Sequence, residues 1–133
     1  IEISMNIEDY ITVFGHKNEF VQALINLINN AREAITARTK SGHIEIKVYA
    51  DATHVKITVQ DSGGGINEKD IEQIFEPYFT TKHQSQGTGL GLYMSHQIIV
   101  NNMNGSIYVK NREEGTCFYI SLPKGDQEAE KTV

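Results

Sequence analysis

A segment without glycine or proline, residues 17–38, constrains the fold of this chain more than any other feature. Its apolar residues recur every three or four positions, which predicts a long helix that ends by Ser41-Gly42. The apolar residues cover nearly the whole circumference, as in a buried helix. A buried helix needs a second layer to pack against, and the rest of the chain must supply it.

Strand patterns on both sides of this helix supply that layer. Apolar and polar residues alternate over residues 1–7, which predicts a half-buried strand, and residues 10–14 predict a second short strand. Two hairpins are predicted downstream, one pairing residues 44–48 with 55–59 and the other pairing residues 107–110 with 116–122.

Two further helices are predicted at residues 68–75, before Pro77, and at residues 89–103, with a polar loop between them. The order of elements predicts an α+β fold. It is a two-layer α/β sandwich, in which a mixed, mostly antiparallel sheet of about five strands carries three helices on one face. Residues 1–123 are predicted to form one domain, and residues 124–133 a polar C-terminal tail.

Composition excludes several classes of protein. Cys117 is the only cysteine, so neither an internal disulfide nor a cysteine-based zinc site is possible, which suits a reducing compartment. No apolar run reaches transmembrane length. The net charge of −5 argues against nucleic acid as a partner. Carboxylates are unevenly distributed, however, because none occurs from Pro77 to Arg112, and an anion could bind there.

Polar side chains form a stripe along the helix predicted at residues 17–38. Five of them recur at spacings that place them on one side of that helix: Gln22, Asn26, Asn29, Asn30 and Glu33. Two interpretations are open. The stripe is the solvent edge of an otherwise buried helix, or it is the wall of a cavity in which an asparagine oxygen ligates Mg²⁺.

A carboxylate and three glycines follow the strand predicted at residues 55–59. Asp61 stands directly before Ser62, Gly63, Gly64 and Gly65. An ionised carboxylate only accepts hydrogen bonds, so Asp61 suits an exocyclic amine such as that of adenine, with the flat ring against the glycines. The alternative is a turn that needs positive φ angles.

Glycines also mark the start of the helix predicted at residues 89–103. In Gly87-Thr88-Gly89-Leu90-Gly91-Leu92 the unpaired N–H groups of the first turn and the helix dipole favour an anion. The spacing matches neither the Rossmann motif nor the P-loop. A flexible hinge is the alternative, but the position inside the carboxylate-free region favours a phosphate.

Residues 74–82 connect an apolar anchor to the polar loop. Phe75 and Phe79 are predicted to pack in the core or to anchor a lid. Lys82 is the cation of the loop, and it either reaches a terminal phosphate or stays solvated.

Taken together and in this order, the four segments resemble the ATP-binding domain of bacterial sensor histidine kinases. That domain is a branch of the superfamily of gyrase-type, mismatch-repair and chaperone ATPases. Residues 22–34 look like its asparagine box and residues 61–66 like its first glycine box. Residues 75–82 resemble its phenylalanine box and residues 87–92 its second glycine box.

The resemblance implies ATP and Mg²⁺ as ligands. Asp61 would recognise the adenine amine, Asn30 would ligate Mg²⁺, and Asn26 would support the phosphates, which the amides at residues 87–91 would hold beneath a lid at about residues 77–86. The ATP-binding residues that it implies are Asn26, Asn30, Asp61, Gly63, Gly65, Ile66, Phe75, Phe79, Thr80, Thr81, Lys82, Gly87, Thr88, Gly89, Leu90, Gly91, Leu92 and Thr116.

Two residues depart from the patterns of this superfamily. The hydrolytic branches carry a water-activating glutamate four residues before the magnesium asparagine, and here Asn26 takes that place. An amide cannot act as a general base at neutral pH, which favours phosphoryl transfer over hydrolysis. Many histidine kinases have a lysine where this chain has Glu33, so neutralisation of the γ-phosphate would fall to Lys82 or Arg32.

The implied function is transfer of the γ-phosphoryl group to a histidine on a separate dimerisation domain, of the same or a partner chain, with a response-regulator receiver domain downstream. None of the five histidines has the sequence context of that acceptor. The resemblance implies a cytoplasmic domain without membrane contact, in a parent protein that can be membrane-anchored. The alternative, motivated by Glu33, is a module that senses ATP or ADP without phosphotransfer. Asn26 disfavours a serine kinase of the anti-sigma-factor type.

Overall fold

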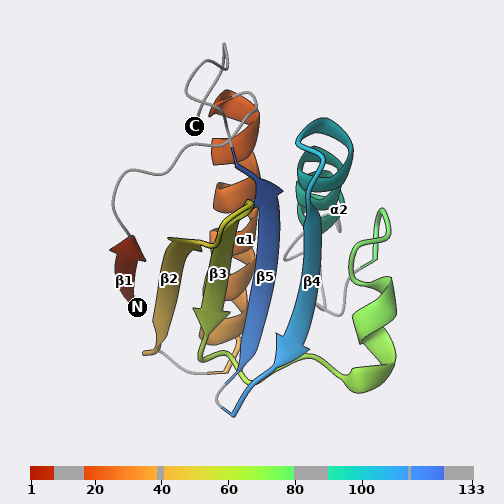
Figure 1. Cartoon of the computed structure of the whole chain (residues 1–133). Helices are drawn as coiled ribbons and strands as arrows, with labels where there is room; N and C mark the ends of the chain where they lie inside the picture. Colours follow the sequence, from red (N-terminus) through yellow and green to blue (C-terminus); the bar gives the residue numbers. More distant parts are fainter. Residues whose placement is uncertain (8–16, 39–40, 80–89, 114, 125–133) are drawn as a thin grey trace.

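A single five-stranded sheet organises the described part of the chain. The computed structural model describes residues 1–7, 17–38, 41–79, 90–113 and 115–124. The strands are β1 (Glu2–Ile7), β2 (His43–Ala50), β3 (His54–Asp61), β4 (Ser106–Asn111) and β5 (Thr116–Pro123). Their order across the sheet is β1-β2-β3-β5-β4 (Figure 1).

The sheet is mixed, as predicted. β1 runs parallel to β2, and the other neighbouring strands are antiparallel. Both predicted hairpins, β2–β3 and β4–β5, are confirmed. In the β2–β3 turn, Oδ1 of Asp51 accepts hydrogen bonds from the backbone N–H groups of Thr53 (2.9 Å) and His54 (2.7 Å), an arrangement that stabilises tight turns. The strand predicted at residues 10–14 lies outside the described residues.

Helices α1 (Lys17–Thr36) and α2 (Gly91–His96) lie side by side on one face of the sheet (Figure 1). α2 continues directly as the π-helical segment η2 (Gln97–Asn102), and η1 (Glu68–Gln73) is a 3₁₀ helix. The helix predicted at residues 89–103 therefore changes its hydrogen-bond pattern halfway, and the one predicted at residues 68–75 is shorter and more tightly wound. The predicted fold, a mixed sheet with three helices, is confirmed.

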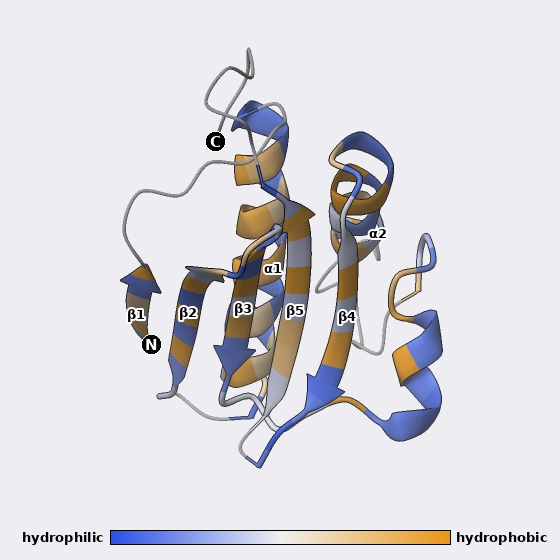
Figure 2. Ribbon diagram, viewed as in Figure 1, coloured by the Kyte–Doolittle hydropathy of each residue, from blue (hydrophilic) through white to orange (hydrophobic). Residues whose placement is uncertain are grey.

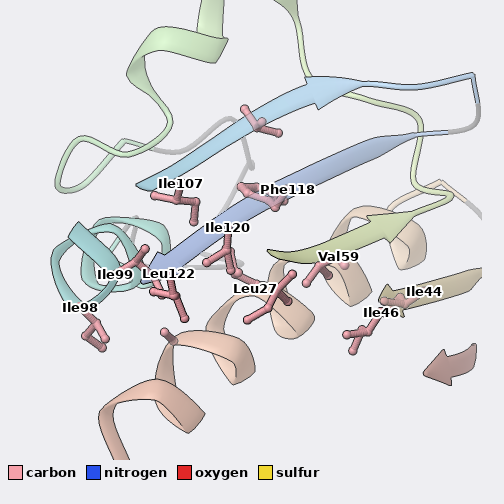
Figure 3. Packing of buried hydrophobic residues seen from close by; sticks show 14 of the residues in the cluster. Leu27, Ile44, Ile46, Val59, Ile98, Ile99, Ile107, Phe118, Ile120 and Leu122 are labelled. Atoms are coloured by element: carbon pink, nitrogen blue, oxygen red, sulfur yellow. The ribbon is translucent and has the colours of Figure 1, made fainter. Parts of the chain in front are cut away.

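The hydrophobic core fills the space between the helices and the sheet. α1 contributes one row of residues spaced four apart: Ala23, Leu27, Ala31 and Ile35. The strands contribute alternate residues, which Figure 2 shows as apolar bands. In Figure 3, Leu27 lies between α1 and the strands that carry Val59 and Ile120. This packing fixes α1 over the centre of the sheet.

The prediction of a half-buried first strand is wrong. The side chains of Ile3, Met5 and Ile7 are 52%, 62% and 56% exposed, although the register places Ile3 beside the fully buried Ile44. Among the described elements, α1 packs mainly on β2 and β3, which leaves β1 at the margin of the helical layer. The apolar side of β1 thus extends the sheet beyond the core.

The prediction that α1 is buried nearly all round is also wrong. Val21 and Ile25, one turn apart, are 42% and 43% exposed on a flank of α1 away from the buried row. α1 is therefore an ordinary helix with one buried face and one exposed side opposite it. None of the helices in the described ranges is long and apolar enough to cross a membrane.

Candidate functional site

The carboxylate of Asp61 is buried at the end of β3, with 2% of the residue exposed. Its Oδ1 accepts hydrogen bonds from the backbone N–H groups of Gly63 (2.8 Å) and Thr116 (3.4 Å). Burial raises the pKa of this carboxyl above its ordinary value, and the two backbone hydrogen bonds oppose that rise only in part. Within the described residues Oδ2 has no hydrogen-bond partner, so it can accept one from a ligand.

The glycines around Asp61 are needed for two different reasons. Gly64 and Gly65 have φ angles of +96° and +87°, which confirms the turn interpretation for these two residues. Gly63 instead allows close packing, because a Cβ there would lie 2.8 Å from the Cβ of Ala34 on α1. Gly115, on the β4–β5 turn, has the same role, because its Cβ would lie 2.3 Å from the carbonyl oxygen of Asp61.

Asn111, at the end of β4, fixes the loop that follows these glycines. Its Oδ1 accepts from the backbone N–H of Ile66 and its Nδ2 donates to the carbonyl of Ile66, both at 2.7 Å. The two hydrogen bonds hold the backbone at Ile66, directly after the glycines that follow Asp61, in one conformation. Sequence reasoning missed Asn111 and Gly115, since no local pattern connects either residue to Asp61.

Asn26 lies in the middle of α1, at the opposite end of the site from Asp61. A Cβ on Gly91, the first residue of α2, would lie 3.9 Å from the Cβ of Asn26. Oδ1 of Asn26 accepts a hydrogen bond from Nε2 of Gln22 at 2.9 Å. Its Nδ2 is buried and has no hydrogen-bond partner within the part of the chain that the structure describes. A buried donor without a partner is costly in a native protein, and it points to a missing acceptor.

α1 spaces the two ends of the site. Gly63 packs on Ala34, two turns after Asn26, and Asn30 lies between them on the same side of the helix. Eight residues of α helix span about 12 Å. That separation suits a ligand with the length of an extended nucleoside triphosphate.

A buried hydrogen bond holds α2 against α1. Oγ of Ser95 donates to the carbonyl oxygen of Ala23 at 3.0 Å, and both residues are fully buried. α2 begins without a side-chain cap and has no acidic residue in its first turn, so its N-terminal end remains favourable for an anion. Sequence reasoning did not single out Ser95.

The remaining predicted site residues fall into two groups. Phe75 packs on His96 and Phe118, with ring centroids 5.3 and 6.1 Å apart, and Phe79 and Ile66 are half-buried against the core. The second group lies outside the described residues: Thr80, Thr81, Lys82, Gly87, Thr88 and Gly89. Arg32 is exposed and lies about 200° around α1 from Asn30, so it does not face the asparagine stripe.

Comparisons with known proteins agree with this arrangement. The family model of histidine kinase-, DNA gyrase B- and HSP90-like ATPases matches residues 15–126. The two-component sensor PprA of Pseudomonas aeruginosa is 40% identical over 115 residues, which cover 84% of this chain and 12% of PprA. Sporulation kinase A of Bacillus subtilis is 42% identical over 118 residues, which cover 88% of this chain and 18% of that kinase. The chain thus matches less than a fifth of either relative.

Solved structures share the fold. The catalytic domain of the histidine kinase ThkA superposes with a TM-score of 0.82 and 37% identity, covering 92% of this chain and 78% of that one. ThkA in complex with the response regulator protein TrrA superposes with a TM-score of 0.75 and 31% identity, covering 95% of this chain and 35% of that one. The chain belongs to the family of histidine kinase-, DNA gyrase B- and HSP90-like ATPases and is homologous to the catalytic domains of sensor histidine kinases.

Proposed function

We propose that this chain binds Mg-ATP and donates the γ-phosphoryl group to a histidine on a separate dimerisation domain, of its own or a partner chain. The observation that carries the proposal is the amide of Asn26, which lies beside the first residue of α2. An amide cannot remove a proton from water at neutral pH. Bound ATP is therefore held for transfer, and catalysis rests on positioning and electrostatics.

The residues at the two ends of the site fit the two ends of ATP. Oδ2 of Asp61 can accept from the adenine amine, and the buried Nδ2 of Asn26 can donate to a phosphate oxygen. Asn30 offers a neutral oxygen of the kind that Mg²⁺ accepts beside phosphates. Bound Mg²⁺ would neutralise charge on the phosphates.

The other residues of the proposed site surround these two ends. Gly63, Gly65, Ile66, Phe75, Phe79 and Thr116 belong to the end near Asp61. We assign Leu90, Gly91 and Leu92 to the phosphate end, and we expect the same role for Thr80, Thr81, Lys82, Gly87, Thr88 and Gly89, which lie outside the described residues. With Arg32 turned away, Lys82 is the cation that we assign to the γ-phosphate.

The proposed setting is a cytoplasmic two-component system. ThkA, a structural neighbour, has been solved in complex with a response regulator protein, and PprA is named a two-component sensor. A receiver domain is accordingly the proposed downstream partner. Neither nucleic acid nor a membrane is expected to contact this domain, since its net charge is −5.

In the test, the full-length protein that contains this domain is incubated with Mg²⁺ and with ATP labelled at the γ-phosphate. We expect acid-labile, alkali-stable label on a histidine outside residues 1–133. Asp61→Asn replaces an acceptor by a donor at the adenine amine, and we expect it to weaken ATP binding about 100-fold. Asp70→Asn, the same change on η1, is the control and should label normally. Tight ATP binding without any labelled histidine would contradict phosphotransfer.

One observation favours a second function. Glu33 lies on the same side of α1 as Asn26, where a carboxylate repels phosphate. A module that senses ATP or ADP without phosphotransfer would tolerate that repulsion. Calorimetry distinguishes the two functions, because a sensor would bind nucleotide, lose binding in Asp61→Asn and transfer no phosphate.

A further inference from the structure

The hydrogen bond from Gln22 to Asn26 determines which end of the Asn26 amide enters the site. Gln22 lies one turn before Asn26 on α1, and its Nε2 donates to Oδ1 of Asn26 at 2.9 Å. An amide nitrogen only donates and an amide oxygen only accepts. The bond therefore holds Oδ1 toward Gln22 and directs Nδ2 the other way.

The side of the Asn26 amide that does not face Gln22 carries a donor, Nδ2. Nδ2 of Asn26 is buried and finds no hydrogen-bond partner among the described residues, and the amide carbon lies 4.0 Å from where a Cβ of Gly91 would be. An N–H group in this position can bind an anionic oxygen but cannot ligate a cation. Oδ1, the atom of this amide that could ligate a cation, already accepts from Gln22 and faces it.

We propose that Gln22 is a positioning residue, which makes Asn26 a donor to a phosphate oxygen and leaves metal ligation to Asn30. The inference rests on the proposed function, because it assumes that the ligand is a nucleoside triphosphate. It adds that the two asparagines of α1 bind different parts of the ligand: Asn26 binds a phosphate oxygen and Asn30 binds the metal. The amide of Gln22 determines this difference, because it fixes the orientation of the Asn26 amide.

The carboxylate nearest to Gln22 before it on α1 has another partner. Glu19, the closest acidic residue before it on α1, accepts a hydrogen bond from Nδ2 of Asn102 at 2.6 Å and so faces η2. Gln22 is exposed, which allows its replacement without opening a cavity in the core.

Two variants of Gln22 test the proposal. In Gln22→Glu the new carboxylate only accepts hydrogen bonds, so the Asn26 amide must turn its Nδ2 toward it and present Oδ1 to the phosphates. Gln22→Met removes the hydrogen bond without adding charge. The chain offers a matched control in Gln97→Glu, because Gln97 on η2 also forms a hydrogen bond with an asparagine four residues later, Asn101.

Binding of ATP is measured by calorimetry, once with Mg²⁺ and once with a chelator. For Gln22→Glu we expect about tenfold weaker binding than for Gln97→Glu in the chelator, because an oxygen then faces the phosphates. The loss should be smaller with Mg²⁺, which can accept that oxygen as a ligand. For Gln22→Met we expect an intermediate loss, again larger in the chelator.

A spectroscopic measurement supplies a readout that does not depend on catalysis. The side-chain ¹⁵N–H₂ signals of Asn26 should shift when ATP binds to the original chain without metal, and this shift should vanish in Gln22→Glu. Equal affinities of Gln22→Glu and Gln97→Glu in the chelator would overturn the proposal. If Gln22→Glu does not fold, Gln22→Met still tests the proposal. The proposal would be overturned if the ratio of the ATP affinity with Mg²⁺ to the ATP affinity in the chelator were the same in Gln22→Met as in the original chain. Absence of ATP binding by the original chain would instead contradict the proposed function.

Discussion

At the scale of single residues, Asp61 combines a binding role with a cost to folding. Its carboxylate is buried, and desolvation raises its pKa above the ordinary 3.8. The folded chain therefore keeps the proton over a pH range in which the unfolded chain has released it. The contribution of this group to stability is complete below the unfolded pKa, and it falls as the pH rises toward the folded pKa.

Asp61→Asn should remove this pH dependence, because an amide does not titrate and its oxygen can still accept from Gly63 and Thr116. Over a pH range that begins near the unfolded value of 3.8 and extends upward, the free energy of unfolding of the variant should rise relative to the original chain. Urea unfolding at several pH values measures the difference. A constant difference across this range would contradict the assigned cause. Asp51→Asn is the control, since hydrogen bonds lower the pKa of exposed Asp51.

Residue chemistry and local spacing could predict Asp61 and Asn26, because a carboxylate before three glycines and a polar stripe on a helix are visible in the sequence. Asn111 could not be predicted, because it binds Ile66 across 45 positions of the chain. Gly115 could not be predicted either, since only the packing of the β4–β5 turn on Asp61 excludes a Cβ.

At the scale of elements, the site depends on the spacing between α1 and α2. Ser95 and Ala23 are both fully buried where the two helices meet, and this contact keeps Gly91 next to Asn26. Sequence periodicity predicted both helices. It could not predict the change to a π-helical pattern at Gln97.

Ser95→Val should separate the two helices. The larger side chain cannot donate to Ala23 and adds volume to a close-packed contact, which should lower the free energy of unfolding by about 2 kcal/mol. ATP affinity should fall in parallel, since Gly91 moves with α2. Ser106→Val, on an exposed position of β4, should change stability by at most about 0.5 kcal/mol. Equal urea midpoints for both variants would show that the contact between Ser95 and Ala23 does not contribute to stability.

At the scale of the whole molecule, the distribution of charge along the chain is a better guide to an anionic ligand than the net charge. The net charge of −5 argues against binding to long polyanions such as nucleic acid, whereas the carboxylate-free segment from Pro77 to Arg112 contains α2, whose first residue, Gly91, lies beside Asn26. The layer arrangement followed from the order of patterns along the chain. The burial of β1 did not, because alternation shows which residues share a side of a strand and not how far the opposite layer extends.

Ile3 and Ile44 provide a test of where the core ends. They are register partners on β1 and β2, but Ile3 is 52% exposed and Ile44 is fully buried. Threonine keeps the β-branched shape and so the preference for a strand. Ile44→Thr should lower the free energy of unfolding by about 2 to 3 kcal/mol, because it removes a methyl group from the core and buries a hydroxyl. Ile3→Thr should cost at most about 0.5 kcal/mol. Urea unfolding measures both, and similar losses would show that the core extends over β1.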